Sequence, residues 1–295
     1  MGTTTLEVEV VTAPPCRQME AYALQEGFSV FHTNETIDSS VQLGSGGFGD
    51  VYALGESHVL KVYKRSSLDT IKQAKRELHM NAFRYKHKNI ITCLGVLIFD
   101  DTRHNNMGMI FERGGEELFN ILVRLNGTLH DLYFKLYKLY LRDMFCGLAF
   151  LRENDIIHCD IKLENLLVTA NRLQIADFGF AHSAKWPLLS NCTMSGTPGY
   201  VPHLALAQDP KFAHRRDPWA AACVVFALTY GGMLYEHSGT REYDKLLEKL
   251  RRGDTETPFS SAYSGLSPRL VGEEIMTHLM FETEPSFKTL HDKLV

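Results

Sequence analysis

The feature of this sequence that most constrains its fold is a change of pattern close to residues 112–116. From residue 38 to 64, apolar stretches alternate with glycine-containing turns, which is typical of antiparallel strands. Beyond the change, apolar residues recur at helical spacing over 131–152, 217–234, 240–251 and 270–280. The pattern predicts an α+β protein in which a small β-rich lobe precedes a larger, mainly helical lobe. Clefts between such units are favoured ligand sites.

The small lobe is expected to contain one helix, over 68–86, where apolar positions recur at helical spacing without glycine or proline. Further strands are expected near 91–99 and 107–111. The strand-like stretch 6–11 is soon interrupted by two prolines. Residues 1–37 are therefore interpreted as an extension of unknown role.

Composition excludes several classes of protein. The chain has 295 residues, 44% of them hydrophobic, which suffices for a buried core. A net charge of −4 offers no basic field for nucleic acid or for a membrane surface. The longest apolar run, 219–230, is too short to span a bilayer, and the N-terminus lacks signal-peptide character. Six cysteines without a C-x-x-C pair are typical of reduced thiols, so a cytoplasmic or nuclear location is expected.

The stretch L-G-S-G-G-F-G-D-V-Y at 43–52 carries closely spaced glycines. Glycine lets a backbone fold tightly over a phosphate and turn its N–H groups toward it. A plain hairpin turn explains the same glycines. Because the stretch leads into a strand-like V-Y rather than into a helix, it does not indicate a dinucleotide-binding fold.

Lys61 lies inside an apolar strand pattern, where a lysine is seldom buried without a partner. Glu77, sixteen residues later in the expected helix, could supply the opposing charge. The alternative is a lysine at a sheet edge whose ammonium reaches solvent.

Residues 157–165 read I-H-C-D-I-K-L-E-N and bring Asp160 and Asn165 close together. Taken alone, they form an ordinary turn with solvated charges. Twelve residues after Asn165, the stretch A-D-F-G contains Asp177. Asn165 and Asp177 would offer the oxygen ligands that Mg²⁺ prefers, while Asp160 remains free to act as a base. Twenty residues beyond Asp177, Thr197 follows in S-G-T-P-G-Y.

In this order and spacing, these stretches resemble the eukaryotic protein kinase family from about Val41 to the C-terminus. The R-D-P-W at 216–219 adds to the likeness. Lysine two places after Asp160, together with G-T-P-x-Y, is similar to the serine/threonine branch. The resemblance implies an ATP- and Mg²⁺-dependent enzyme that phosphorylates Ser or Thr of protein substrates. It implies a kinase domain over 38–295, with the N-lobe at 38–111, the hinge at 112–115 and the C-lobe at 116–295.

The resemblance also implies roles for single residues. Lys61 would hold the α- and β-phosphates and pair with Glu77, Asp160 would accept the substrate hydroxyl proton, and Lys162 would meet the γ-phosphate. The metal ligands would be Asn165 and Asp177.

A nucleotide-binding set follows in the same way. Phe111 matches the residue that precedes the adenine hinge of the family, and Val51, Val59 and Leu167 would sandwich the adenine. Core packing without ligand contact is the alternative for these apolar residues. The full set is Leu43, Gly44, Ser45, Gly46, Gly47, Phe48, Gly49, Val51, Val59, Lys61, Phe111, Glu112, Gly114 and Leu167.

The chain departs from the family pattern at several positions. Cys159 replaces the arginine that usually pairs with a phosphate on the activation segment. For Cys159, the role of a small residue that fills a tight turn is favoured over a redox role. V-P-H at 201–203 replaces A-P-E, and Lys288 replaces its arginine partner, which suggests a compensated change. Val59 replaces an alanine, which narrows the adenine slot slightly. A viral or otherwise fast-evolving source is one interpretation.

Two further expectations concern specificity and activation. Glu164, with Glu116 or Glu117, matches acidic positions that bind basic residues upstream of the phosphoacceptor; solvated surface charges are the alternative. Ala227 stands where such relatives carry another acid, so the preference is expected to be weak. Constitutive activity is expected, because the thiol of Cys159 cannot form an ion pair with a phosphate on the activation segment. The candidate phosphorylation sites on the activation segment are Ser190, Thr193 and Ser195. The cations close to them in sequence are Lys185 and Arg172.

Two other functions stay open. A pseudokinase scaffold is disfavoured because it would not need the base Asp160. A small-molecule kinase is disfavoured by G-T-P-G-Y, which resembles a surface that positions a peptide hydroxyl. The oligomeric state cannot be read from the sequence.

Overall fold

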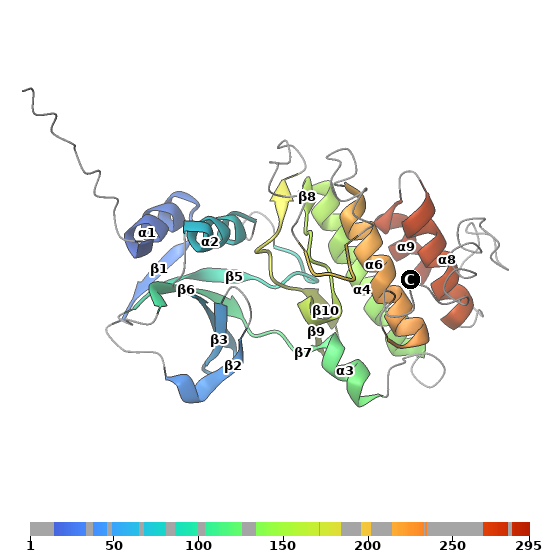
Figure 1. Ribbon diagram of the computed structural model, residues 1–295, viewed down its shortest axis with the longest axis horizontal. Helices are drawn as coiled ribbons and strands as arrows, with labels where there is room; N and C mark the ends of the chain where they lie inside the picture. The colour runs from blue at the N-terminus through green and yellow to red at the C-terminus, as the bar shows by residue number, and fades with distance from the viewer. Residues whose placement is uncertain are drawn as a thin grey trace, which may run out of the picture.

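The computed structural model consists of a small lobe built on one sheet and a larger lobe built mainly of helices (Figure 1). This confirms the predicted bilobal α+β fold. The structure describes residues 15–33, 38–45, 49–64, 68–80, 86–99, 104–125, 134–170, 172–183, 196–201, 214–232, 234, 268–282 and 285–295. The expected strand 6–11 and the expected helix 240–251 lie outside these residues.

The small lobe contains a six-stranded sheet in which only the pair β1–β5 is parallel. The antiparallel strands expected between residues 38 and 64 are β2, β3 and β4, and residues 55–57 form the turn between β3 and β4. In spatial order the strands are β1 (Ser29–His32), β5 (Cys93–Ile98), β6 (His104–Glu112), β4 (His58–Lys64), β3 (Gly49–Leu54) and β2 (Gln42–Ser45).

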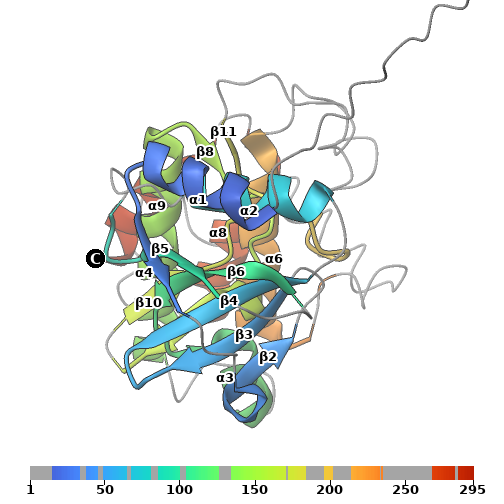
Figure 2. The ribbon, with the colours of Figure 1, turned by 90° about the vertical axis from the view of Figure 1, so that its left-hand side faces the viewer.

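Two helices, α1 (Pro15–Gln25) and α2 (Leu68–Met80), lie side by side over the sheet (Figure 2). The buried face of α2 presents Ala74 and Leu78 to a hydrophobic cluster that includes Met109 of β6. Glu77 is next to Leu78 and is itself buried, so this packing places its carboxylate against the sheet.

Helix α1 and strand β1 come from the stretch that the sequence suggested was an extension, and they pack onto the small lobe. Met19 and Ala23 are fully buried in the same cluster as Leu78. Polar contacts join α2 to α1 and to the residue that follows α1. Nδ1 of His79 lies 2.9 Å from Oε2 of Glu26, and the Lys75 ammonium lies 5.4 Å from the centre of the Tyr22 ring.

The large lobe is built around α6, in which every residue except Trp219 and Tyr230 is buried. The apolar run at 219–230 is therefore part of a core helix. In the part of the chain that the structure describes, no helix has the length and apolar character that a membrane crossing requires. The helices are α3 (Leu118–Arg124), α4 (Phe134–Glu153), α6 (Arg216–Tyr230), α8 (Pro268–Phe281) and α9 (Phe287–Leu294).

Residues 113–115 connect the two lobes. The chain runs from β6 through residues 113–115 into β7, and a Cβ at Gly115 would collide with the Val168 carbonyl oxygen. Glycine is required there because the backbones approach so closely. Two small sheets, β10–β9–β7 and β11–β8, hold the residues that follow α4. Their strands are β7 (Glu116–Glu117), β8 (Ile156–Ile157), β9 (Leu166–Thr169), β10 (Arg172–Ile175) and β11 (His182–Ser183).

The packing of α1 predicts that Met19→Ala lowers the free energy of unfolding by about 2–5 kcal/mol, because it opens a cavity in the small-lobe core. Leu24→Ala is the matched control: Leu24 lies on the same helix but is 59% exposed, so its truncation should have little effect. Chemical denaturation of the full chain measures both. Equal effects of the two variants would contradict the placement of α1 in the core.

Candidate active site

A cleft of about 610 Å³ opens between the lobes, within the usual range for ligand pockets. Every predicted site residue that the structure describes lines this cleft; Gly46, Gly47 and Phe48 lie outside the described residues. The predicted residues in its lining are Leu43, Gly44, Ser45, Gly49, Val51, Val59, Lys61, Glu77, Phe111, Glu112, Gly114, Asp160, Lys162, Asn165, Leu167 and Asp177.

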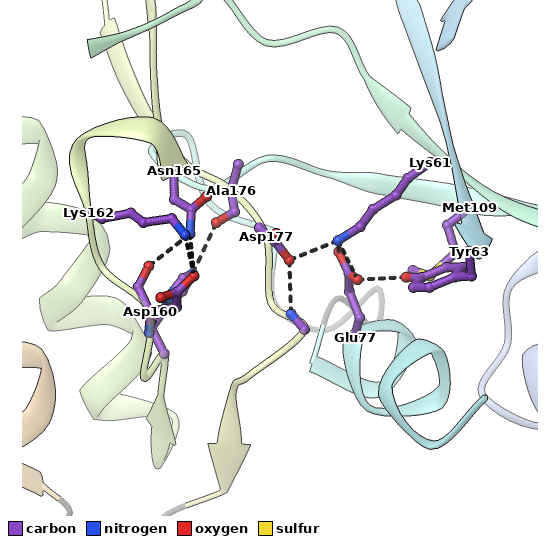
Figure 3. Close-up of polar contacts among 11 residues, drawn as sticks. Lys61, Tyr63, Glu77, Met109, Asp160, Lys162, Asn165, Ala176 and Asp177 are labelled. Carbon is purple, nitrogen blue, oxygen red and sulfur yellow. Dashed lines mark hydrogen bonds and ion pairs between the residues drawn. The ribbon is translucent and has the colours of Figure 1, made fainter. Parts of the chain in front are cut away.

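At the back of the cleft, Lys61 bridges two carboxylates from different elements (Figure 3). Its Nζ lies 2.8 Å from Oε2 of Glu77 on α2 and 2.8 Å from Oδ1 of Asp177, which follows β10. Glu77 is buried and the Lys61 side chain is 12% exposed. The predicted pairing of Lys61 with Glu77 is thus present, and Asp177 joins it.

The charges of this group depend on one another. Burial alone would lower the pKa of the Lys61 ammonium, but the carboxylates of Asp177 and Glu77 outweigh burial and raise that pKa. Burial, followed by repulsion from Asp177, raises the pKa of Glu77 despite the opposing effect of Lys61. For Asp177 burial also acts upward, but Lys61 outweighs it and lowers the pKa. Lys61 therefore stays charged, and Asp177 remains an anion.

Asp160 is held by contacts to both of its carboxylate oxygens. Oδ1 accepts hydrogen bonds from the Thr197 backbone N–H at 3.0 Å and from the Thr197 hydroxyl at 2.7 Å. Oδ2 lies 3.0 Å from Nζ of Lys162 and 3.0 Å from Nδ2 of Asn165. The Lys162 ammonium also reaches the Thr197 hydroxyl, at 2.8 Å. A nearly buried carboxylate is thus fixed in orientation by four donors.

The backbone before Asp160 adopts a left-handed conformation, with φ of 66° at Cys159. Asp217 of α6 holds this strained turn by accepting the backbone N–H groups of His158 and Cys159 at 2.8 and 2.9 Å. The Cys159 thiol is buried, packs with Ile157 and Phe180, and places no charge on the activation segment.

His158 connects this turn to the stretch around Asp177. Its Nε2 lies 3.1 Å from the Ala176 carbonyl oxygen, and its ring meets the Phe178 ring edge-on at 4.8 Å between centres. The two stretches that carry Asp160 and Asp177 are therefore packed as one unit.

The oxygen atoms of Asn165 and Asp177 fit a magnesium ion. The Asn165 amide nitrogen donates to Asp160, so the side-chain carbonyl oxygen is the atom that Asn165 could offer to a metal. Asp177 is 35% exposed toward the cleft. Within the described ranges no cluster of three or more His, Cys, Asp or Glu could hold a metal. Mg²⁺ needs no such cluster, because one or two protein oxygens and the phosphates of a nucleotide suffice.

The first two residues of the hinge between the lobes have their backbone N–H groups in use. The N–H of Glu112 donates to the Thr92 carbonyl oxygen at 3.0 Å, and that of Arg113 donates to the Ser57 carbonyl oxygen at 2.8 Å. The Glu112 carboxylate accepts from Nε2 of Gln174 at 2.8 Å. A ligand edge that needs a backbone donor would therefore meet Gly114 rather than Glu112 or Arg113.

Several residues that line the cleft were not predicted. Ile91 and Ala176 add to its apolar walls, and Asn120 lies at its mouth. Ala176 could have been identified from its position directly before Asp177. Ile91 and Asn120 carry no signal in the sequence.

The three glutamates at the mouth differ in their surroundings. Exposed Glu116 forms two hydrogen bonds with the Arg124 guanidinium. Glu117 lines the cleft, where burial and then the charge of Glu164 raise its pKa. Among the described residues, Oε2 of Glu164 is buried and has no hydrogen-bond partner. Glu117 and Glu164 therefore offer negative charge to a ligand, whereas Glu116 is already neutralised.

The altered A-P-E region is described only in part, since His203 lies outside the described residues and Lys288 is exposed on α9. Another cation holds neighbouring structure together. The Arg215 guanidinium, at the start of α6, donates to the carbonyl oxygens of Met280 and Glu282 at the C-terminal end of α8. Such contacts satisfy carbonyls that a helix leaves unpaired.

Comparisons with known proteins agree with this geometry. Residues 37–285 match the family described as "Protein kinase domain". The crystal structure of the PF14_0431 kinase domain matches with a TM-score of 0.56 and 21% identity, over 70% of this chain and 68% of that one, which supports the fold.

Several protein kinases are about equally similar to this chain in sequence. The probable serine/threonine-protein kinase MARK-B of Dictyostelium discoideum is 30% identical over 69% of this chain and 28% of its own length. The cAMP-dependent protein kinase catalytic subunit of Schizosaccharomyces pombe is 30% identical over 70% of this chain and 40% of its own. The Aurora kinase of Encephalitozoon cuniculi is 29% identical over 78% and 85%. The chain thus spans less than half the length of the first two.

Proposed function

The chain belongs to the protein kinase family, and we propose that it is an ATP- and Mg²⁺-dependent serine/threonine protein kinase. The observation that carries this proposal is the buried Asp160 carboxylate, held by Thr197, Lys162 and Asn165 in the cleft that also contains Lys61 and Asp177. A hydroxyl nucleophile needs a base at this point, and an oriented carboxylate meets that need.

Each residue of the cleft then has a role in aligning the reactants. Lys61, oriented by Glu77, binds phosphate oxygens, and Lys162 lies beside the base, where charge develops during transfer. Asp160 accepts the proton of the substrate hydroxyl, and Thr197 keeps its carboxylate turned toward that position. Phosphoryl transfer depends mainly on alignment and charge neutralisation, so this set suffices.

Asn165 and Asp177 would hold Mg²⁺, which neutralises phosphate charge when bound. The adenine would lie between Val51, Val59 and Leu167 and meet the backbone of Glu112 and Gly114. The remaining nucleotide positions are Leu43, Gly44, Ser45, Gly46, Gly47, Phe48, Gly49 and Phe111.

The alternative is a pseudokinase that binds partners without catalysis. A scaffold has no use for a carboxylate fixed by four donors, so the surroundings of Asp160 favour an enzyme. The kinase domain is proposed to cover 38–295, with 15–33 completing its small lobe. A reducing intracellular compartment accords with the reduced thiols of Cys93, Cys146, Cys159 and Cys223. The proposed substrates are proteins rather than nucleic acid or membrane.

We further propose that activity is constitutive. Cys159 offers no cation to an activation-segment phosphate, and the Asp160–Thr197 hydrogen bonds already join that segment to the base. Arg76 and Arg216 lie near His182 of this segment, where burial, followed by their charges, lowers the pKa of His182 to about 4.

The first prediction concerns catalysis. Lys61→Met, Asp160→Asn and Asp177→Asn should each lower Mg²⁺-dependent phosphorylation of Ser/Thr peptides by roughly 10²-fold or more, because each loses transition-state stabilisation. Asp155→Asn makes the same chemical change outside the cleft and should keep wild-type turnover. Steady-state assays of the purified proteins measure the rates. Full turnover by Asp160→Asn would mean that the base is assigned wrongly.

The second prediction concerns the substrate. A peptide library should show a modest preference for basic residues upstream of the phosphoacceptor, and Glu117→Gln or Glu164→Gln should weaken it by roughly threefold or more. Glu116→Gln is the control, since Arg124 already neutralises that carboxylate. Selection of acidic or proline-directed peptides by the wild type would remove the idea.

The third prediction concerns activation. Phosphatase-treated protein, and the triple variant Ser190→Ala, Thr193→Ala, Ser195→Ala, should keep activity within about threefold of the untreated enzyme, because Cys159 cannot receive a phosphate. These three residues lie outside the described part of the chain. A fall of about 100-fold in the phosphatase-treated protein, restored by an upstream kinase, would show that another cation has taken over the arginine's role.

A further inference from the structure

Tyr63 touches both members of the Lys61–Glu77 pair. It lies two residues after Lys61 on β4, so both side chains point to the same face of the sheet. Its hydroxyl donates to Oε2 of Glu77 at 2.6 Å, and the Lys61 ammonium lies 5.6 Å from the centre of its ring (Figure 3). The tyrosine thus offers a donor to the anion and a π face to the cation.

The surroundings of Tyr63 leave it little freedom. The side chain is fully buried in the cluster that also contains Ala74 and Leu78 of α2. Its hydroxyl oxygen lies 2.9 Å from the Met109 sulfur, which is a weak acceptor. A hydroxyl has one proton, and a carboxylate is the stronger acceptor, so the proton goes to Glu77. Burial, followed by the charge of Glu77, raises the pKa of the Tyr63 hydroxyl, so it remains a donor.

Glu77 needs such support because its carboxylate is buried. The positive charge of the Lys61 ammonium is shared between Glu77 and Asp177, so it does not fully neutralise the Glu77 carboxylate. A buried carboxylate with too few partners would turn away from Lys61, and α2 would move with it.

We propose that Tyr63 is a positioning residue of the kinase site, which holds Glu77 against Lys61 and thereby keeps α2 in the arrangement required for nucleotide binding. The proposal rests on the proposed function for its catalytic consequence. Its structural part, the anchoring of α2 through Glu77, does not depend on catalysis.

The test compares Tyr63→Phe with Tyr137→Phe in the full chain. Tyr137 is also fully buried, and its hydroxyl lies 3.0 Å from the Thr229 hydroxyl, between α4 and α6 and outside the cleft. Each variant removes one buried hydroxyl, so similar losses of stability are expected. Only Tyr63→Phe should speed amide hydrogen exchange across residues 72–80 of α2 and lower kcat/KM for ATP by about 10-fold.

A double-variant cycle tests whether Tyr63 acts through Glu77. In the Glu77→Ala background, Tyr63→Phe should no longer change the exchange of α2, because its acceptor is gone. Matching exchange and kcat/KM for Tyr63→Phe and Tyr137→Phe would overturn the proposal. So would an undiminished effect of Tyr63→Phe in the Glu77→Ala background.

Hydrogen exchange also separates this proposal from the proposed function. Faster exchange of α2 in Tyr63→Phe supports the anchoring role even if the wild type transfers no phosphate, an outcome that would refute only the kinase activity. If Tyr63→Phe does not fold, Tyr63→Met fills the site with an adaptable apolar side chain that offers Glu77 no donor. It should also speed exchange of α2, and wild-type exchange in this variant would overturn the proposal.

Discussion

The bridge from Lys61 to Glu77 and Asp177 is the interaction on which the rest of the cleft depends. It joins the small-lobe sheet, helix α2 and the segment after β10, so it fixes both lobes around one ammonium group. Removing one member of a buried ion pair leaves an uncompensated charge, which is more costly than the pair's net contribution to stability. The arrangement therefore has few alternatives: either all three groups meet, or α2 and the Asp177 segment separate.

The two lobes support this bridge in different ways. In the large lobe, Asp217 of the buried helix α6 holds the strained turn at Cys159, and this turn positions Asp160. In the small lobe, α2 packs on the sheet beside α1, with Lys75 of α2 contacting Tyr22 of α1 and His79 contacting Glu26 just after α1. Contacts within the chain thus position α2. This accords with the proposal that the enzyme does not need a phosphate on the activation segment, for which Cys159 supplies no arginine.

The sequence predicted most of the cleft but little of what supports it. Lys61, Glu77, Asp160 and Asp177 were found because they occur in an order and spacing that resemble the protein kinase family. Helix α1 was missed because its buried face consists of few apolar residues, including Met19, whose partners lie far away in sequence. Tyr63 was missed for a related reason, because a strand pattern does not indicate that the tyrosine hydroxyl will contact the Glu77 carboxylate on a helix. Contacts between distant segments depend on tertiary packing, which residue spacing does not encode.

The most direct test of the account is the rate of Mg²⁺–ATP-dependent Ser/Thr phosphorylation by the purified wild type and by Glu77→Gln, measured side by side. Gln keeps the shape of Glu77 but removes the charge that orients Lys61, so the account predicts activity in the wild type and a rate lower by about 10²-fold in the variant. A wild type without activity, or a Glu77→Gln protein as active as the wild type, would contradict the claim that the bridge organises a working kinase site.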